Sequence, residues 1–107
     1  MLISGAIDEV AARAVKLLGD PLRAEIVGYL ASEQLCTCHL VEMPGARQPT
    51  VSHHLKVLRD AGLVEPIPDG RFTYYRLIEA ELARLRDDID RLVSAAEGAP
   101  RRFRPCE

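Results

Sequence analysis

Two cysteines stand two positions apart in the run Cys36-Thr37-Cys38, and a third, Cys106, stands near the end of the sequence. Thiolates are soft ligands that suit trivalent arsenic and antimony, cadmium, lead and zinc. Two thiols alone make a weak site, so we expect a third ligand, and Cys106 is the remaining thiol of the chain. In a reducing compartment, closely spaced thiols are more often metal ligands or redox centres than a structural disulfide. The sequence therefore predicts a metal site made of Cys36, Cys38 and Cys106.

The chemistry of these thiols leaves several alternatives open. Three thiolates suit the pyramidal coordination of trivalent arsenic, whereas adding His39 would give a Cys₃His set that suits zinc or cadmium. An oxidation sensor is also compatible with the sequence, with Cys106 resolving a sulfenic acid on Cys36 or Cys38. The remaining interpretations are a pair of small core residues and a metal-storage site.

The spacing of Cys36 and Cys38 limits where such a site can lie. Side chains two positions apart in an α-helix point roughly 200° away from each other, since each residue turns by about 100°. The two thiols therefore cannot face one ion from a regular helix. Either the site lies in irregular chain before a helix, or binding unwinds the first turn of that helix. In both cases a bound ion constrains the segment that packs on the next helix.

The elements that position the thiols follow from apolar spacing and from capping residues. Apolar side chains three and four apart predict helices, and short apolar runs bounded by turn residues predict strands. Asp20 can cap a helix that begins at Pro21, where the missing N–H is harmless. The predicted helices cover about residues 7–18, 21–31, 38–43, 49–61 and 79–96, and the predicted strands cover 63–67 and 72–77.

This order of elements predicts a mainly α fold with a small β-hairpin, a winged helix-turn-helix with an extra dimerisation helix at each end. We assign residues 1–97 to this DNA-binding and dimerisation domain, and residues 98–107 to a flexible basic tail that carries Cys106. The chain has 107 residues, and such a monomer would have trouble burying the apolar stripes of both terminal helices. We therefore expect each stripe to meet its twin across a two-fold axis in a homodimer.

The last predicted helix has the apolar spacing of a helix–helix seam. The residues of this seam are Leu82, Leu85, Ile89, Leu92 and Ala96. The same helix carries Asp87, Asp88 and Asp90 but no histidine, so we interpret these carboxylates as a solvated face and predict no second metal site there.

The helix predicted over residues 49–61 turns Val51, Leu55 and Leu58 inward, which leaves its other side for contact with double-stranded operator DNA. The predicted DNA-binding residues are Gln48, Thr50, Ser52, His53, Lys56, Arg59 and Arg71. The side chain of Gln48 suits adenine, and the shorter hydroxyl side chains suit bases or phosphates. The long side chains of Lys56 and Arg59 suit the phosphate backbone, and Arg71 at the hairpin tip suits a phosphate or the minor groove.

The neighbouring histidines His53 and His54 point about 100° apart on this helix, so we expect DNA contact or solvent exposure for both rather than a shared metal. The net charge of the chain is −2, yet the predicted reading helix and hairpin region carries Arg47, Lys56, Arg59, Arg71 and Arg76, which is compatible with a local DNA-binding face.

Other classes of protein are disfavoured by what the sequence lacks. No apolar run approaches the roughly 20 residues that span a membrane, and the sequence starts without the pattern of a secretory signal, so we expect a cytoplasmic protein with no membrane partner. The chain has no nucleophile–base pair, no phosphate-binding glycine loop and no open hydrolytic metal site, so we expect no enzyme activity.

Three segments of the sequence resemble the ArsR/SmtB family of metal-sensing repressors. They are the thiol box around Cys36-Thr37-Cys38-His39-Leu40, residues 48–64, and the hairpin with Tyr74-Tyr75-Arg76-Leu77. The resemblance covers about residues 7–95, and the thiol box is similar to that of the arsenic/antimony and cadmium/lead branches. Gln34 and His39 replace the usual acidic residues of the box, and Met43-Pro44 and Arg47 depart from the usual turn.

The resemblance implies a homodimer that sits on operator DNA without metal and leaves when metal binds. It favours an all-sulfur site for trivalent arsenic or antimony as the inducer. A cadmium/lead or zinc sensor on the same scaffold, or a thiol redox switch, remains as the alternative.

Overall fold

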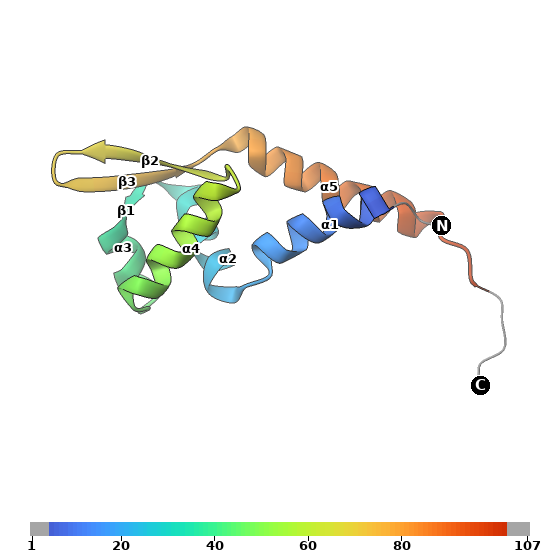
Figure 1. Ribbon diagram of the computed structural model, residues 1–107, viewed down its shortest axis with the longest axis horizontal. Helices are drawn as coiled ribbons and strands as arrows, with labels where there is room; N and C mark the ends of the chain where they lie inside the picture. The colour runs from blue at the N-terminus through green and yellow to red at the C-terminus, as the bar shows by residue number, and fades with distance from the viewer. Residues whose placement is uncertain (1–4, 103–107) are drawn as a thin grey trace.

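The computed structural model describes the backbone of residues 5–102 and the side chains of residues 12–102. The elements in chain order are α1 (Gly5–Leu18), α2 (Pro21–Ser32), β1 (Leu35–Cys36), α3 (Thr37–Glu42), α4 (Gln48–Asp60), β2 (Val64–Asp69), β3 (Phe72–Leu77) and α5 (Glu79–Glu97). In Figure 1, α2 to β3 form one body, from which α1 and α5 extend side by side. The mainly α fold with a small β-hairpin is confirmed, and Cys106 lies outside the described residues. Within the described part of the chain, no helix is both long enough and apolar enough to cross a bilayer.

The helix boundaries follow from local chemistry. The carboxylate of Asp20 accepts hydrogen bonds from the backbone N–H groups of Leu22 (2.9 Å) and Arg23 (3.0 Å), and Pro21 occupies the first turn. These bonds satisfy two of the N–H groups that a helix leaves without a partner at its start. After α4 the chain reverses at Gly62, whose φ of 78° is a conformation that residues with a Cβ rarely adopt.

The sheet has three strands in the order β1-β3-β2, all antiparallel. The sequence predicted the hairpin of β2 and β3 but not β1, which pairs Leu35 with Tyr75 and Cys36 with Tyr74. Two residues are too few to show an alternating pattern, so the third strand had no signal in the sequence. β2 contains Pro66 and Pro68, which agrees with its place at an edge of the sheet, where an N–H group is not needed on the open side.

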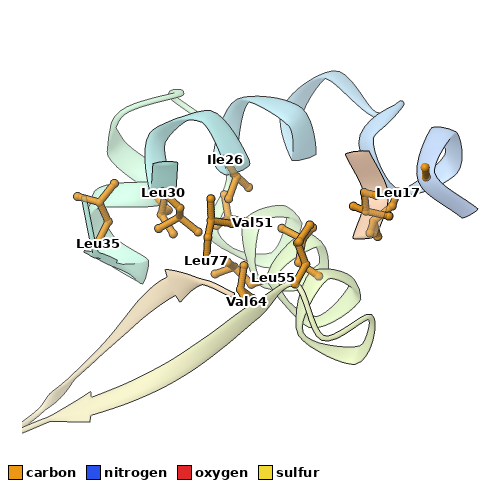
Figure 2. Close-up of a cluster of buried hydrophobic side chains, with 13 residues drawn as sticks. Leu17, Ile26, Leu30, Leu35, Val51, Leu55, Val64 and Leu77 are labelled. Atoms are coloured by element: carbon orange, nitrogen blue, oxygen red, sulfur yellow. The ribbon is translucent and has the colours of Figure 1, made fainter. Parts of the chain in front are cut away.

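The core lies where α2, α3, α4 and the sheet converge (Figure 2). Val51, Leu55 and Leu58 of α4 are at most 3% exposed, which confirms the predicted inner face of this helix. Their main partners are Ile26, Leu30, Leu35, Leu40, Leu63, Val64 and Leu77. Each such side chain contributes about 1.5–3 kcal/mol when it is fully buried, so these contacts fix α4 against the sheet and α2.

The two terminal helices pack against each other, with Ala14 and Leu17 of α1 and Leu85 of α5 buried. A guanidinium N–H of Arg13 also donates to the carboxylate of Glu81 over 3.3 Å. Several apolar side chains on these helices stay on the surface, namely Val15 (58% exposed), Ile89 (42%), Leu92 (38%) and Val93 (50%). The intrachain packing therefore leaves part of the predicted seam uncovered.

The expectation that the acidic run of α5 is a solvated face is wrong for one of its three residues. Asp87 and Asp90 are exposed, but Asp88 is only 8% exposed. Asp88 lies three positions after the buried Leu85, on the same side of the helix, and Arg91 approaches its carboxylate at 3.8 Å. Its burial thus follows from helical spacing, and the nearby guanidinium offsets its charge.

Candidate thiol site and DNA-reading surface

Cys36 and Cys38 lie at the junction between β1 and α3. Cys36 ends the strand and caps the helix with extended backbone (φ −86°, ψ 167°), and Cys38 belongs to the first turn of the helix. Their Cα atoms are 5.4 Å apart, and the structure joins their sulfurs in a disulfide. The thiol pair therefore straddles the start of α3, with Cys36 before the helix and Cys38 inside it. The bend in the backbone turns both side chains to one place.

His39 lies beside the two cysteines. Its Nδ1 accepts the backbone N–H of Cys36 over 3.3 Å and lies 3.2 Å from the Sγ of Cys36. One ligand atom from each of Cys36, Cys38 and His39 lies within 4.8 Å of the others. Sulfur and imidazole nitrogen are donors for soft and borderline ions, so these residues fit the metal that the sequence predicted once the disulfide is reduced to two thiolates. The third predicted ligand, Cys106, lies outside the described residues.

A pocket of about 510 Å³ connects the thiol pair with the predicted DNA-reading surface. Its walls include Cys36 and Cys38, the first residue of α4, Gln48, and the hairpin-tip residue Arg71. The apolar side chains of Val41 and Phe72 also line it. A metal ion bound by the two sulfurs would therefore lie in the same pocket as Gln48 and Arg71, two residues that are predicted to contact DNA.

The residues predicted to bind DNA are placed on the surface. Gln48, Thr50, Ser52, His53, Lys56 and Arg59 are exposed on α4, and Arg71 is exposed at the tip of the hairpin. The ammonium group of Lys56 donates to the carboxylate of Asp60 over 2.9 Å. This hydrogen bond lowers the pKa of Asp60. The ammonium group of Lys56 is therefore paired with an ionised carboxylate when no DNA is bound.

The expectation of DNA contact or solvent exposure is correct in placing His53 on the surface and wrong for His54, which is only 7% exposed. Arg23 donates from Nε to the Nδ1 of His54 over 3.3 Å, and the Nε2 of His54 lies 3.5 Å from a carboxylate oxygen of Asp20. Burial lowers the pKa of His54, and the charge of Asp20 opposes this effect. The signal was present in the sequence, because Val51, His54, Leu55 and Leu58 follow the i, i+3, i+4, i+7 spacing of one helix face.

Comparisons with known proteins agree with this fold. Residues 20–66 match the model of the family described as bacterial regulatory protein, arsR family. The chain is 43% identical over 75 residues to the arsenical resistance operon repressor of Staphylococcus aureus, an alignment that covers 70% of this chain and 68% of that protein. It is 34% identical over 73 residues to the cadmium resistance transcriptional regulatory protein CadC of Listeria innocua, covering 67% of this chain and 61% of that protein.

A solved structure shows the same architecture. The solution structure of the homodimeric winged helix-turn-helix DNA-binding domain Mb0332 from Mycobacterium bovis superposes with a TM-score of 0.65 at 25% identity, covering 94% of this chain and 93% of that domain. The fold is thus a winged helix-turn-helix, as the order of elements predicted. The family model, the identity to the Staphylococcus aureus repressor and the shared fold lead to one conclusion: this chain belongs to the arsR family of bacterial regulatory proteins.

Proposed function

We propose that the protein is a cytoplasmic transcriptional repressor that binds operator DNA as a homodimer and leaves it when trivalent arsenic or antimony is captured by cysteine thiolates. The proposed ligands are Cys36, Cys38 and Cys106. The observation that carries the proposal is the shared pocket, in which the thiol pair lies beside Gln48 and Arg71. The arsenical resistance operon repressor of Staphylococcus aureus, to which the chain is 43% identical, supports the choice of arsenic.

The thiols can act on DNA binding through the short path between α3 and α4. An ion bound to sulfur fixes the separation of Cys36 and Cys38 and so constrains the first turn of α3, which packs against α4. If the DNA-bound protein needs a different arrangement of α4 and the hairpin from the ion-bound protein, the ion stabilises the state that does not bind DNA. Emptying the operator requires that the two states differ in their affinity for the ion by a few kcal/mol.

The proposed DNA contacts follow from which side chains α4 exposes. Gln48, Thr50, Ser52 and His53 lie in the first half of the helix, the part that meets base edges in this motif. Lys56, Arg59 and Arg71 contact phosphates or the minor groove. The partially exposed seam of α1 and α5 gives the second copy its docking surface, and two copies place two α4 helices on one DNA.

A cadmium, lead or zinc sensor is the second candidate, and the cluster of Cys36, Cys38 and His39 is the observation that favours it. Imidazole nitrogen suits zinc and cadmium, so a site that includes His39 would prefer these ions. The two candidates differ in the part played by His39: arsenic needs only the thiolates of Cys36, Cys38 and Cys106, whereas the divalent ions add His39 to these three. This difference makes them separable by substitution.

The test is a DNA-binding titration under reducing conditions, with a duplex that the wild-type protein selects from a random pool. Arsenite, antimonite, cadmium, lead and zinc are added in parallel. We expect arsenite to release the wild-type protein, and the Cys36→Ser/Cys38→Ser double variant to stay bound with every ion. Cys106→Ser should lose the arsenite response, whereas His39→Asn should keep it. Release of the double variant by arsenite would contradict the proposal, and release by peroxide but by no ion would favour the redox switch.

A further inference from the structure

The imidazole of His54 sits between a cation and an anion, and this fixes which of its nitrogens carries the proton. The Nδ1 atom accepts from Arg23, so it has a free lone pair. The proton is then on Nε2, which faces the carboxylate of Asp20. A neutral imidazole with one acceptor and one donor nitrogen satisfies both neighbours at once. His54 is not among the proposed metal ligands or DNA contacts.

Arg23 and Asp20 each connect His54 to further backbone. One guanidinium nitrogen of Arg23 donates to the carbonyl oxygens of Lys16 and Leu17, at 3.3 Å each, which belong to the last turn of α1. Asp20 accepts from the N–H groups that begin α2. Carbonyl groups at a helix end and N–H groups at a helix start lack partners within their helices. One side chain of α4 thus contacts the two residues whose side chains satisfy the polar ends of α1 and α2.

We propose that His54 is a positioning residue for DNA binding, whose neutral imidazole fixes the orientation of α4 on the corner between α1 and α2. The inference rests on the proposed DNA-binding function and goes beyond it. Since α1 belongs to the expected dimer contact, the same side chain links the separation of the two subunits to the direction in which each α4 faces DNA. Apolar contacts alone allow a helix to slide or turn slightly, whereas a directional hydrogen bond from Arg23 and the nearby carboxylate of Asp20 restrict its rotation.

Protonation would break this arrangement. A second proton on His54 must go to Nδ1, where it would face the N–H of Arg23 and a like charge. The charged or titratable groups around the ring are Asp20 and Arg23 at the start of α2 and His53 on α4 itself. α3 and β2 also pack on α4, and within the described residues neither contributes to the shift in the pKa of His54. Backbone hydrogen bonds from Arg23 and Leu22 and the charge of Arg23 lower the pKa of Asp20 against the opposing effect of burial, so its carboxylate stays ionised near neutral pH.

The sign of the pH effect follows from the lowered pKa of His54. The unfolded chain takes up this proton around pH 6.5, the ordinary value for histidine, and the folded chain only at lower pH. Stability from the neutral ring is therefore present above pH 6.5 and is lost as the pH falls toward the folded pKa. DNA affinity should decrease over the same interval.

The experiment compares His54→Gln, His54→Leu and the wild-type protein between pH 5.5 and 7.5 on the duplex selected by the wild-type protein. Glutamine has one acceptor and one donor and does not titrate, whereas leucine fills space without polar contacts. We expect His54→Leu to bind DNA at least tenfold more weakly at pH 7.5 and His54→Gln to stay within threefold of wild type. The part of the acid-induced loss due to His54 should be absent in His54→Gln, which keeps His39 and His53. Tyr29→Phe, which removes an exposed hydrogen bond to Glu25 elsewhere on α2, is the control and should bind as wild type does.

Nitrogen-15 NMR of the free protein provides a second readout that needs no DNA. We expect the Nε2–H form of His54 at pH 7.5. An Nδ1–H form, full binding by His54→Leu, or a pH profile of His54→Gln equal to that of wild type would each overturn the inference. Failure of the wild-type protein to select any duplex would instead contradict the proposed function. The two failures are therefore distinguishable.

Discussion

The body formed by α2 to β3, here the head, and the pair α1 and α5, here the arm, are built differently. In the head, Val51, Leu58 and Leu63 are at most 1% exposed, and apolar side chains from helices and sheet surround them. In the arm, Val15 and Val93 are at least half exposed although they stand on helices with apolar seams. The head thus has a core of its own, whereas the arm leaves apolar side chains exposed on its surface. The difference indicates that folding is centred on the head and association on the arm.

The largest expected effect is on the core of the head. Leu58→Ala removes a fully buried side chain and should lower the free energy of unfolding by about 2–5 kcal/mol, because it leaves a cavity. Urea unfolding measured by circular dichroism gives the value. Leu92→Ala on the arm, measured at low protein concentration, is the control and should cost less than about 1 kcal/mol. Equal losses would remove the distinction between head and arm.

The second prediction addresses association through the arm. Leu92→Glu places a charge on the exposed seam, and burying an unpaired carboxylate against apolar side chains is costly. The dimer dissociation constant should rise at least tenfold, as measured by sedimentation equilibrium. The helix content should not change, since the position is already exposed in the single chain. A wild-type protein that sediments as a monomer at all concentrations would contradict the expected dimer.

The third prediction concerns the place where the head meets the arm. Gly62 has a φ of 78°, and an added Cβ would contact the side chain of Glu81 on α5 at 3.5 Å. Gly62→Ala should therefore cost about 1 kcal/mol of stability, mainly through backbone strain. Gly28→Ala, in the interior of α2 with no atom within 4 Å of the new Cβ, should instead add about 0.5–1 kcal/mol. Thermal unfolding of both variants checks the opposite signs.

The smallest expected effect is on the outer face of the head. Lys56 lies on the exposed side of α4, where Asp60 holds its ammonium group. Lys56→Ala should weaken binding to all duplexes by a similar factor and lower the slope of log affinity against log salt by about 2, if one phosphate contact is lost from each subunit of the dimer. Binding isotherms at several salt concentrations measure the slope. An unchanged slope would exclude a phosphate contact at this position.

Much of the head could be predicted from the sequence because its signals are local. The Asp20-Pro21 start of α2, the inward residues of α4 and the strands of the hairpin each follow from spacing or capping within a few residues. β1 could not be predicted, since it exists only through pairing with β3, far along the chain. Its pairing also places Cys36 at the end of a strand. The meeting of the two thiols therefore depends on a contact that local patterns do not contain.

Local sequence patterns also failed to place several polar side chains. The sequence predicted that the thiols are ligands but could not show that the imidazole of His39 comes within 3.2 Å of Cys36, because that requires the bend between strand and helix. His54 and Asp88 had the spacing of buried positions, yet their residue types argued for the surface. Partners contributed by Arg23 and Arg91 make these positions tolerable. Spacing was the better guide at these two positions, where the fold supplies a polar partner for the buried side chain.

The prolines of β2 have a consequence for how the hairpin behaves among other molecules. A strand at the edge of a sheet is a template on which another chain can add a strand, provided that its backbone offers donors. Pro66 and Pro68 have no backbone N–H group. The row of hydrogen-bond donors along the open edge of β2 is therefore interrupted. Two copies of the protein at high concentration should therefore not associate by pairing the edge strands of their hairpins.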